Sequence, residues 1–226
     1  MIIIGHKDGS IEKASISRFT QKTKGYNTHT IIGGEFAVGK DSDDVAFKTL
    51  LGSCVAIMFY DSKEKIKAMN HFLLPTTDSR NEDMKYGLYS VEAMLNEMYK
   101  MGCKKQNMSA KISGGADIMQ LNMDMNNSIG YRNVEFAKDF CKSEGFRLIS
   151  EHTRGIHGRL ILLADKFQTF IKVTKKSETD NKILYEEKAL QTEITKAPVI
   201  KEYVGGVDLF GVDKAKVEPE MEIELF

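Results

Sequence analysis

The residues with the clearest chemical potential are a cysteine and a histidine that border two apolar segments. Gly52-Ser53-Cys54 precedes one segment, and Asn70-His71 ends the next. Free cysteine has a pKa of about 8.5, and a neighbouring imidazole can take its proton to give the nucleophilic thiolate. The pattern is typical of attack on an amide carbon at neutral pH, with the histidine then protonating the departing amine. The bend at Gly52-Ser53 adds backbone N–H groups that could bind an oxyanion.

A hairpin must bring the two side chains together. We expect strands at 54–60 and 65–71, joined by four residues, which is a usual hairpin length. In a symmetric hairpin Cys54 faces His71, and directly paired residues have Cβ atoms about 4.5–5.5 Å apart. The residues alone leave an alternative open, in which Cys54 is a small core residue and His71 a hydrogen-bonded residue at a strand end.

The surrounding pattern predicts a single α+β domain. Apolar residues recur at three- and four-residue steps from Met84 to Met101 and again from Val134 to Cys141, and each stripe ends at a glycine, Gly102 or Gly145. We expect two main helices there, packed on mixed or antiparallel sheets. Further strands are expected at 31–38, 45–51, 111–113, 146–152, 159–163 and 169–173.

The charge distribution divides the chain into three parts. The 226 residues hold 32 Lys+Arg and 32 Asp+Glu, but residues 174–226 carry 8 Lys against 12 acids, so a body of net +4 precedes a tail of net −4. We expect an N-terminal arm at 1–30, held loosely, a domain at 31–173, and an acidic tail at 174–226. Two similar segments of that tail, 207–210 and 223–226, each combine an acidic residue with apolar ones, and the tail is either a solvated segment or carries a docking motif.

Composition excludes several classes of protein. Zero net charge argues against general nucleic-acid binding, and no apolar run is long enough for membrane insertion or a signal peptide. Three scattered cysteines form neither a disulfide framework nor a zinc site, so we expect a cytoplasmic protein with Cys103 and Cys141 in structural positions. The histidines at 152 and 157 lack a known ligand spacing, and we expect no metal.

Four segments resemble the successive signatures of the chemoreceptor glutamine deamidase family, CheD. The most specific is Leu-Gly-Ser-Cys-Val, with a histidine 17 residues after the cysteine. The resemblance runs in order from about Ile31 to Val173. The four segments are Thr49–Ile57, Asn70–Pro75, Lys111–Ala116 and Ile129–Val134.

The resemblance implies a fold like that of bacterial cysteine deamidase toxins and an activity that converts receptor glutamines to glutamates. It assigns the nucleophile to Cys54 and the general base and acid to His71, through a thioester and without a cofactor. It implies chemotaxis receptors as partners and a CheC-type phosphatase as a further one. Two other functions stay open: an adaptor that binds receptors or the phosphatase with little catalysis, and a cysteine amidohydrolase acting on small amides.

One position departs from the family pattern. Members of the family can use a threonine six residues before the cysteine as a third catalytic residue, and here that residue is Lys48, with Thr49 next. Adjacent strand residues face opposite sides, so we expect Thr49 to reach His71 only if a bulge turns it; otherwise a backbone carbonyl or Asn70 orients the histidine.

The glycine pair Gly114-Gly115 follows a strand and is expected to line the site near the cysteine, where backbone must approach the substrate closely. Gly52 and Ser53 are expected to line the oxyanion position. Arg132-Asn133 opens the second helix and is interpreted as a structural cap rather than a substrate contact.

Overall fold

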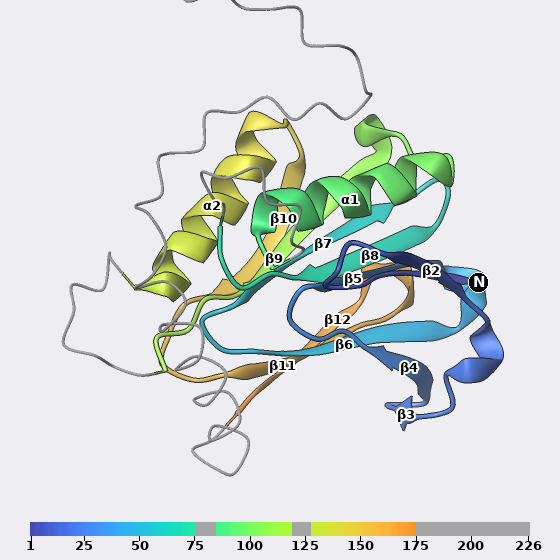
Figure 1. Cartoon of the computed structure of the whole chain (residues 1–226), viewed down its shortest axis with the longest axis horizontal. Coiled ribbons are helices and arrows are strands. Elements are labelled where there is room, and N and C mark those ends of the chain that lie inside the picture. Colours follow the sequence, from blue (N-terminus) through green and yellow to red (C-terminus); the bar gives the residue numbers. More distant parts are fainter. Residues whose placement is uncertain (76–84, 119–127, 175–226) are drawn as a thin grey trace, which may run out of the picture.

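The computed structural model describes residues 1–75, 85–118 and 128–174, which form three layers (Figure 1). Two helices cover one face of a large sheet, and a smaller sheet packs against its other face. The arrangement confirms the predicted α+β class, with mixed sheets and two main helices. The likeness to cysteine deamidase toxins stays a prediction, and most of the expected tail, 175–226, lies outside the described residues.

The large sheet has seven strands in the order β10-β9-β7-β8-β5-β1-β2. All its pairs are antiparallel except β9 with β10. The strands are β1 (Ile2–Gly5), β2 (Ile11–Ala14), β5 (Glu35–Lys40), β7 (Val55–Asp61), β8 (Ile66–His71), β9 (Met108–Gly114) and β10 (Arg147–Thr153).

The smaller sheet has five strands in the order β12-β11-β6-β4-β3, with β4 and β6 parallel. Short 3-10 turns at Ile16–Arg18 and Asp41–Asp43 connect the two sheets, whereas those at Lys105–Asn107 and Asp165–Phe167 precede β9 and β12. The strands are β3 (Lys22–Thr23), β4 (Tyr26–Thr30), β6 (Val45–Leu51), β11 (Arg159–Leu163) and β12 (Thr169–Val173).

The helices are α1 (Gly87–Lys100) and α2 (Ile129–Ser143), close to where apolar spacing predicts them. Gly102 and Gly145 follow them with φ of 96° and 67°, the left-handed conformation that glycine adopts at low cost. Their apolar stripes pack on the large sheet, although Met84 lies outside the described residues. Neither helix has the length and apolarity that crossing a membrane would need, as far as the described residues go.

The two sheets share a core of their own. Strand alternation turns Phe47 and Leu51 of β6 inward, where they meet Ala56, Met58 and Met69 of the large sheet. All five side chains are at most 1% exposed. Burial of these large apolar side chains therefore determines which residues of β6 face the large sheet.

The hairpin of β7 and β8 differs from the expected one. Strand β7 runs one residue later than expected, and β8 begins one residue later but still ends at His71. The cause is Asp61, which stays in β7 and whose carboxylate accepts the backbone N–H groups of Lys63 and Glu64 at 2.8 and 3.0 Å. The paired residues are accordingly Met58 with Met69 and Val55 with Phe72, so Cys54 does not stand directly opposite His71. The predicted register is wrong by two residues, a shift that changes partners but keeps every side chain on its face.

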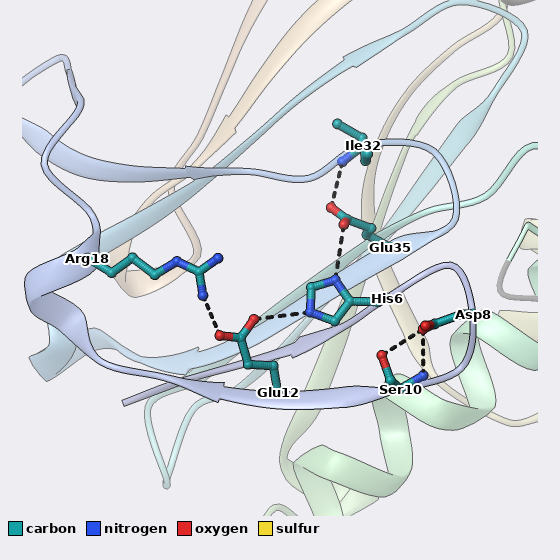
Figure 2. Close-up of polar contacts among 7 residues, drawn as sticks. All are labelled: His6, Asp8, Ser10, Glu12, Arg18, Ile32 and Glu35. Carbon is teal, nitrogen blue, oxygen red and sulfur yellow. Dashed lines mark hydrogen bonds and ion pairs between the residues drawn. The ribbon is translucent and has the colours of Figure 1, made fainter.

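The N-terminal segment is also more ordered than its polar composition indicates. Strand β1 lies between β5 and β2, and its three isoleucines are at most 3% exposed, so residues 1–30 are not a loosely held arm. Figure 2 shows how polar contacts fasten it: His6 lies 3.1 Å from a carboxylate oxygen of Glu12 and 3.3 Å from one of Glu35. Arg18 pairs with the other oxygen of Glu12.

Burial of β1 predicts a large effect of truncating it. Ile4→Ala is expected to lower the free energy of unfolding by about 2–5 kcal/mol, because Ile4 is 1% exposed within the core between the sheets. Urea denaturation measures this. Ile11→Ala is the control, since Ile11 on β2 is 42% exposed and its truncation should stay within about 0.5 kcal/mol. Equal effects of the two substitutions would favour a loose arm.

Candidate active site

Thr49 lies in the interior between the two sheets, and no bulge is needed to place it there. It pairs with Ile161 in a regular β6–β11 register and is fully buried in phase with Phe47 and Leu51. Lys48 faces the opposite side of the strand and is partly exposed. The expectation that Thr49 points away without a bulge is therefore wrong, because the apolar side chains on either side of it set the inward phase of the strand.

The Thr49 hydroxyl joins the two sheets at His71. Its Oγ1 donates to the carbonyl oxygen of Ile31 at 2.8 Å and lies 2.8 Å from Nδ1 of His71. A hydroxyl has one proton, and a carbonyl can only accept. With that proton directed to Ile31, Oγ1 must accept from Nδ1–H. The neutral His71 ring is thereby set to the tautomer that carries its proton on Nδ1 and a lone pair on Nε2.

The second ring nitrogen of His71 has no hydrogen-bond partner. Nε2 is buried and unpaired. The side chain as a whole is 5% exposed, and desolvation lowers the pKa of His71 from 6.5 to about 4, opposed only in part by the Ile31 carbonyl. At neutral pH the ring is therefore uncharged, with its basic nitrogen available to accept a proton.

Cys54 lies on the same face of the large sheet as His71. The bridge between Val55 and Phe72 turns these two residues toward the helices, so Cys54 and His71, each one residue earlier in the chain, turn toward the smaller sheet. They are diagonal neighbours across the hairpin, a relation in which residues stand about 7–8 Å apart and an aromatic-sized side chain can bridge the gap. Cys54 packs at the edge of the core between the sheets.

The three thiols have different surroundings. Cys54 is partly exposed, whereas Cys103 and Cys141 are 5% and 1% exposed in the core beneath the helices. Burial raises the pKa of Cys103 and of Cys141 to about 12, which keeps both thiols protonated. Their buried positions agree with the structural places predicted for them.

The glycine pair lies directly against the backbone of the cysteine. Gly115 N–H donates to the carbonyl oxygen of Cys54 and Ala116 N–H to that of Gly52, both at 2.8 Å. Gly114 has φ of 119°, and a Cβ there would lie 2.2 Å from the Cys54 carbonyl oxygen. No side chain fits at this position, and the structure brings Gly52, Ser53, Gly114 and Gly115 together around Cys54. That they line the substrate or oxyanion position stays a prediction.

Asn133 is the residue that the sequence interpretation assigned wrongly. Ser128, not Asn133, caps α2, since its side chain accepts the N–H of Tyr131 at 3.1 Å. The Asn133 amide instead reaches out of the helix to the carbonyl oxygens of Ser53 at 3.0 Å and Leu73 at 2.9 Å. The sequence does contain a signal for this role, because Asn133 is a polar residue on the otherwise apolar, buried face of a helix.

Asn70, the other proposed orienting residue, does not serve His71. Its Oδ1 accepts the N–H of Ile57 at 2.8 Å, and its Nδ2 donates to Ser90 on α1 at 3.1 Å. The side chain thus lies on the helix face of the large sheet, opposite to His71. It completes backbone pairing between β7 and β8 where the ladder is interrupted.

His152 and His157, the two histidines near the C-terminal end of the domain, are not arranged as a metal site. Nδ1 of His152 lies 3.0 Å from the Arg159 guanidinium, which also donates to the carbonyls of His152 and Arg154. Residues 1–75, 85–118 and 128–174 contain no group of three or more His, Cys, Asp or Glu side chains that could hold a metal ion.

Comparison with known proteins identifies the family. The model of the CheD chemotactic sensory transduction family matches residues 73–173. A probable chemoreceptor glutamine deamidase CheD of Xanthomonas campestris pv. campestris (strain B100) is 34% identical over 169 residues, which cover 74% of this chain and 82% of that protein. The chain belongs to the CheD family. A CheD protein of Stenotrophomonas maltophilia (strain K279a), with the same name, is 35% identical over 170 residues, with the same coverage.

Solved structures add little to this CheD assignment. The hypothetical protein YfiH of Bacillus licheniformis aligns with 50% of this chain and 48% of its own at 12% identity, with a TM-score of 0.32. That similarity is too low to support an inference about fold or function. The assignment therefore depends on the sequence relatives.

The depressed pKa of His71 predicts a pH dependence of stability. Unfolded His71 takes up a proton as the pH falls through about 6.5, whereas folded His71 does so only near pH 4, so the unfolded state binds more protons in between. Stability should therefore decrease as the pH falls from 6.5 to 4. His71→Asn, which keeps a donor near Thr49, should reduce this slope by up to about 1.4 kcal/mol per pH unit.

Urea denaturation at a series of pH values measures the slope. Burial also lowers the pKa of His29, so part of the slope should remain in the variant. His157→Asn is the control, because His157 is exposed and should leave the slope as in the wild type. A wild-type slope in His71→Asn would show that the folded protein does not exclude the proton from this ring.

Proposed function

We propose that this CheD-family chain is a protein-glutamine deamidase that hydrolyses glutamine side-chain amides of chemotaxis receptors to glutamates. The names of its relatives, chemoreceptor glutamine deamidases, support the substrate. The contact of 2.8 Å between Thr49 Oγ1 and His71 Nδ1 is the observation that carries the chemistry, because it leaves a basic Nε2 on the face that also bears Cys54. Cys54 is the proposed nucleophile, His71 the general base and acid, and Thr49 the third member that orients the ring.

The first half of the reaction forms a thioester. As the Cys54 sulfur attacks the amide carbon, its proton passes to His71 Nε2 and the carbonyl electron pair moves onto oxygen. Burial disfavours an isolated imidazolium, but the negative charge that develops beside it offsets that penalty. When the carbonyl re-forms, His71 gives its proton to the amide nitrogen and ammonia leaves.

The second half returns the enzyme to its starting state. Water replaces ammonia beside His71, gives a proton to Nε2, and attacks the thioester carbon. The carbon–sulfur bond then breaks, the proton returns to Cys54, and the side chain leaves as glutamate. The turn at Gly114 and Gly115 packs against the backbone of Cys54 and the first turn of α2, and we expect it to hold the bend that carries Cys54 in place during both halves.

The two other functions have less support. The adaptor hypothesis started from a displaced threonine, and Thr49 is in contact with His71. No feature of the described residues favours a small-amide substrate over a protein one. A CheC-type phosphatase partner, a cytoplasmic location and a reaction without a cofactor stay predictions.

The proposal predicts that Cys54 is indispensable and that the Thr49 hydroxyl accelerates the reaction. Receptor cytoplasmic fragments incubated with the wild type should show glutamine peptides converted to glutamate by mass spectrometry, and Cys54→Ala should show none. Thr49→Val should reduce the rate about five- to twelvefold, since one orienting hydrogen bond contributes about 1–1.5 kcal/mol. Thr49→Ser is the matched control, because it keeps the hydroxyl and should retain most of the rate.

The same assay separates the alternatives. Deamidation that persists in Cys54→Ala would contradict the proposed nucleophile. A wild type that binds receptor fragments without changing their mass would favour the adaptor. Release of ammonia from free glutamine or small amides, with receptors unchanged, would favour the small-amide hydrolase.

A further inference from the structure

Asn133 connects the chain segments that carry the two proposed catalytic residues. One hydrogen of its Nδ2 reaches the carbonyl of Ser53, the residue before Cys54, and the other reaches the carbonyl of Leu73, two residues after His71. Both partners are carbonyl oxygens, which only accept, so the amide nitrogen must be the group that faces them. Both of its donors are therefore used at a single point between the two segments.

The side chain is held in place by burial. Asn133 is fully buried, and its own Oδ1 is buried without a partner. Leaving a buried acceptor unpaired costs about 1–3 kcal/mol, and the two hydrogen bonds that Nδ2 donates are the contacts of this side chain that offset the cost.

A close contact between two glycines brings α2 near enough for this reach. A Cβ on Gly130 would lie 2.7 Å from the carbonyl oxygen of Gly115, and one on Gly115 would lie 2.3 Å from Val134. The first turn of α2 therefore packs directly on the glycine turn beside Cys54. Asn133, three residues after Gly130, lies on the same face of the helix and meets the bend Gly52–Cys54.

The contact with Ser53 also fixes the orientation of the next N–H group. The peptide bonds of the described residues are trans, so the C=O of Ser53 and the N–H of Cys54 point in opposite directions from one plane. Because the C=O is held toward Asn133, the N–H of Cys54 is held away from it. In cysteine and serine hydrolases, the N–H of the nucleophile itself is a recurrent donor to the oxyanion.

We infer that Asn133 is a positioning residue that aims the backbone N–H of Cys54 at the oxygen of the tetrahedral intermediate. The inference rests on the proposed deamidation. Without Asn133 the Ser53–Cys54 peptide can rotate, and the N–H no longer meets the oxygen that gains charge when the Cys54 sulfur attacks. The Cys54 side chain, packed at the edge of the core between the sheets, and His71, in contact with Thr49, should keep their places.

Asn133→Asp tests this, because it keeps the shape and replaces the amide donors by a carboxylate that repels both carbonyls. The kcat for receptor deamidation should fall about 10²–10³-fold, as removal of one oxyanion donor does, with little change in KM. Binding of a peptide aldehyde with a glutamine-like side chain should weaken by a similar factor, since addition of the Cys54 sulfur to the aldehyde carbon places an oxygen at the same point. Alkylation of Cys54 by iodoacetamide forms no oxyanion and should be unchanged.

A second substitution separates positioning from a general loss of structure. Met98→Ala opens a cavity under α1, away from Ser53, and should lower stability while leaving the ratio of aldehyde binding to alkylation as in the wild type. If Asn133→Asp lowers aldehyde binding and alkylation equally, or neither, the inference is overturned. If the wild type itself does not deamidate receptors, the proposed function fails instead, and the comparison of aldehyde with iodoacetamide still decides the role of Asn133.

A measurement on the wild type covers the case in which Asn133→Asp does not fold. In protein labelled with ¹⁵N, the backbone N–H of Cys54 should shift strongly downfield when the aldehyde adds, because it then donates to the new oxyanion. An unshifted Cys54 N–H in the adduct would overturn the inference.

Discussion

The hydroxyl of Thr49 is the point on which the arrangement of the site depends. Thr49 lies in the smaller sheet, and its hydroxyl contacts the carbonyl oxygen of Ile31 and the His71 ring on β8 of the large sheet. The hydroxyl can donate only one hydrogen bond. Because that bond goes to a carbonyl, the direction of the hydrogen bond at His71 is determined, and with it the tautomer of the ring. Any change in the spacing of the two sheets would separate these partners, so the packing of the core between the sheets is part of the chemistry.

The spacing of the two sheets is set close to Cys54, the proposed nucleophile. The chain leaves the smaller sheet at Leu51 and enters the large one at Val55, so the three residues between them cross from one sheet to the other. Leu51 is held by pairing with Arg159, and Val55 by pairing with Gly114. Cys54 therefore sits on a short link whose two ends are fixed by different sheets. The turn at Ile31 is held as well, because the carboxylate of Glu35 accepts the N–H of Ile32 at 3.2 Å (Figure 2).

Local pattern predicts most of the fold and places the candidate site residues on neighbouring elements, and it fails where long-range contacts decide. Strands 45–51 and 159–163 agree with the prediction because their apolar and turn residues are unambiguous. The register of the hairpin is missed because it depends on the side chain of Asp61. The phase of Thr49 depends on which neighbours find space between two sheets, and the pairing of residues 1–30 depends on partners far along the chain. None of these is encoded within a window of a few residues.

The candidate site is held from both faces of the large sheet, so two side chains are enough to fix the positions of His71 and of the bend at Cys54. From the smaller sheet, Thr49 fixes the plane and tautomer of His71; from the helix layer, Asn133 fixes the bend that carries Cys54. Each constraint uses a hydrogen bond to a carbonyl, in a position from which water is excluded, so neither is weakened by competition with solvent. His71 and Cys54, the proposed base and nucleophile, are held by different layers, so the distance between them depends on how those layers pack. Their relative position is therefore sensitive to the packing of all three layers.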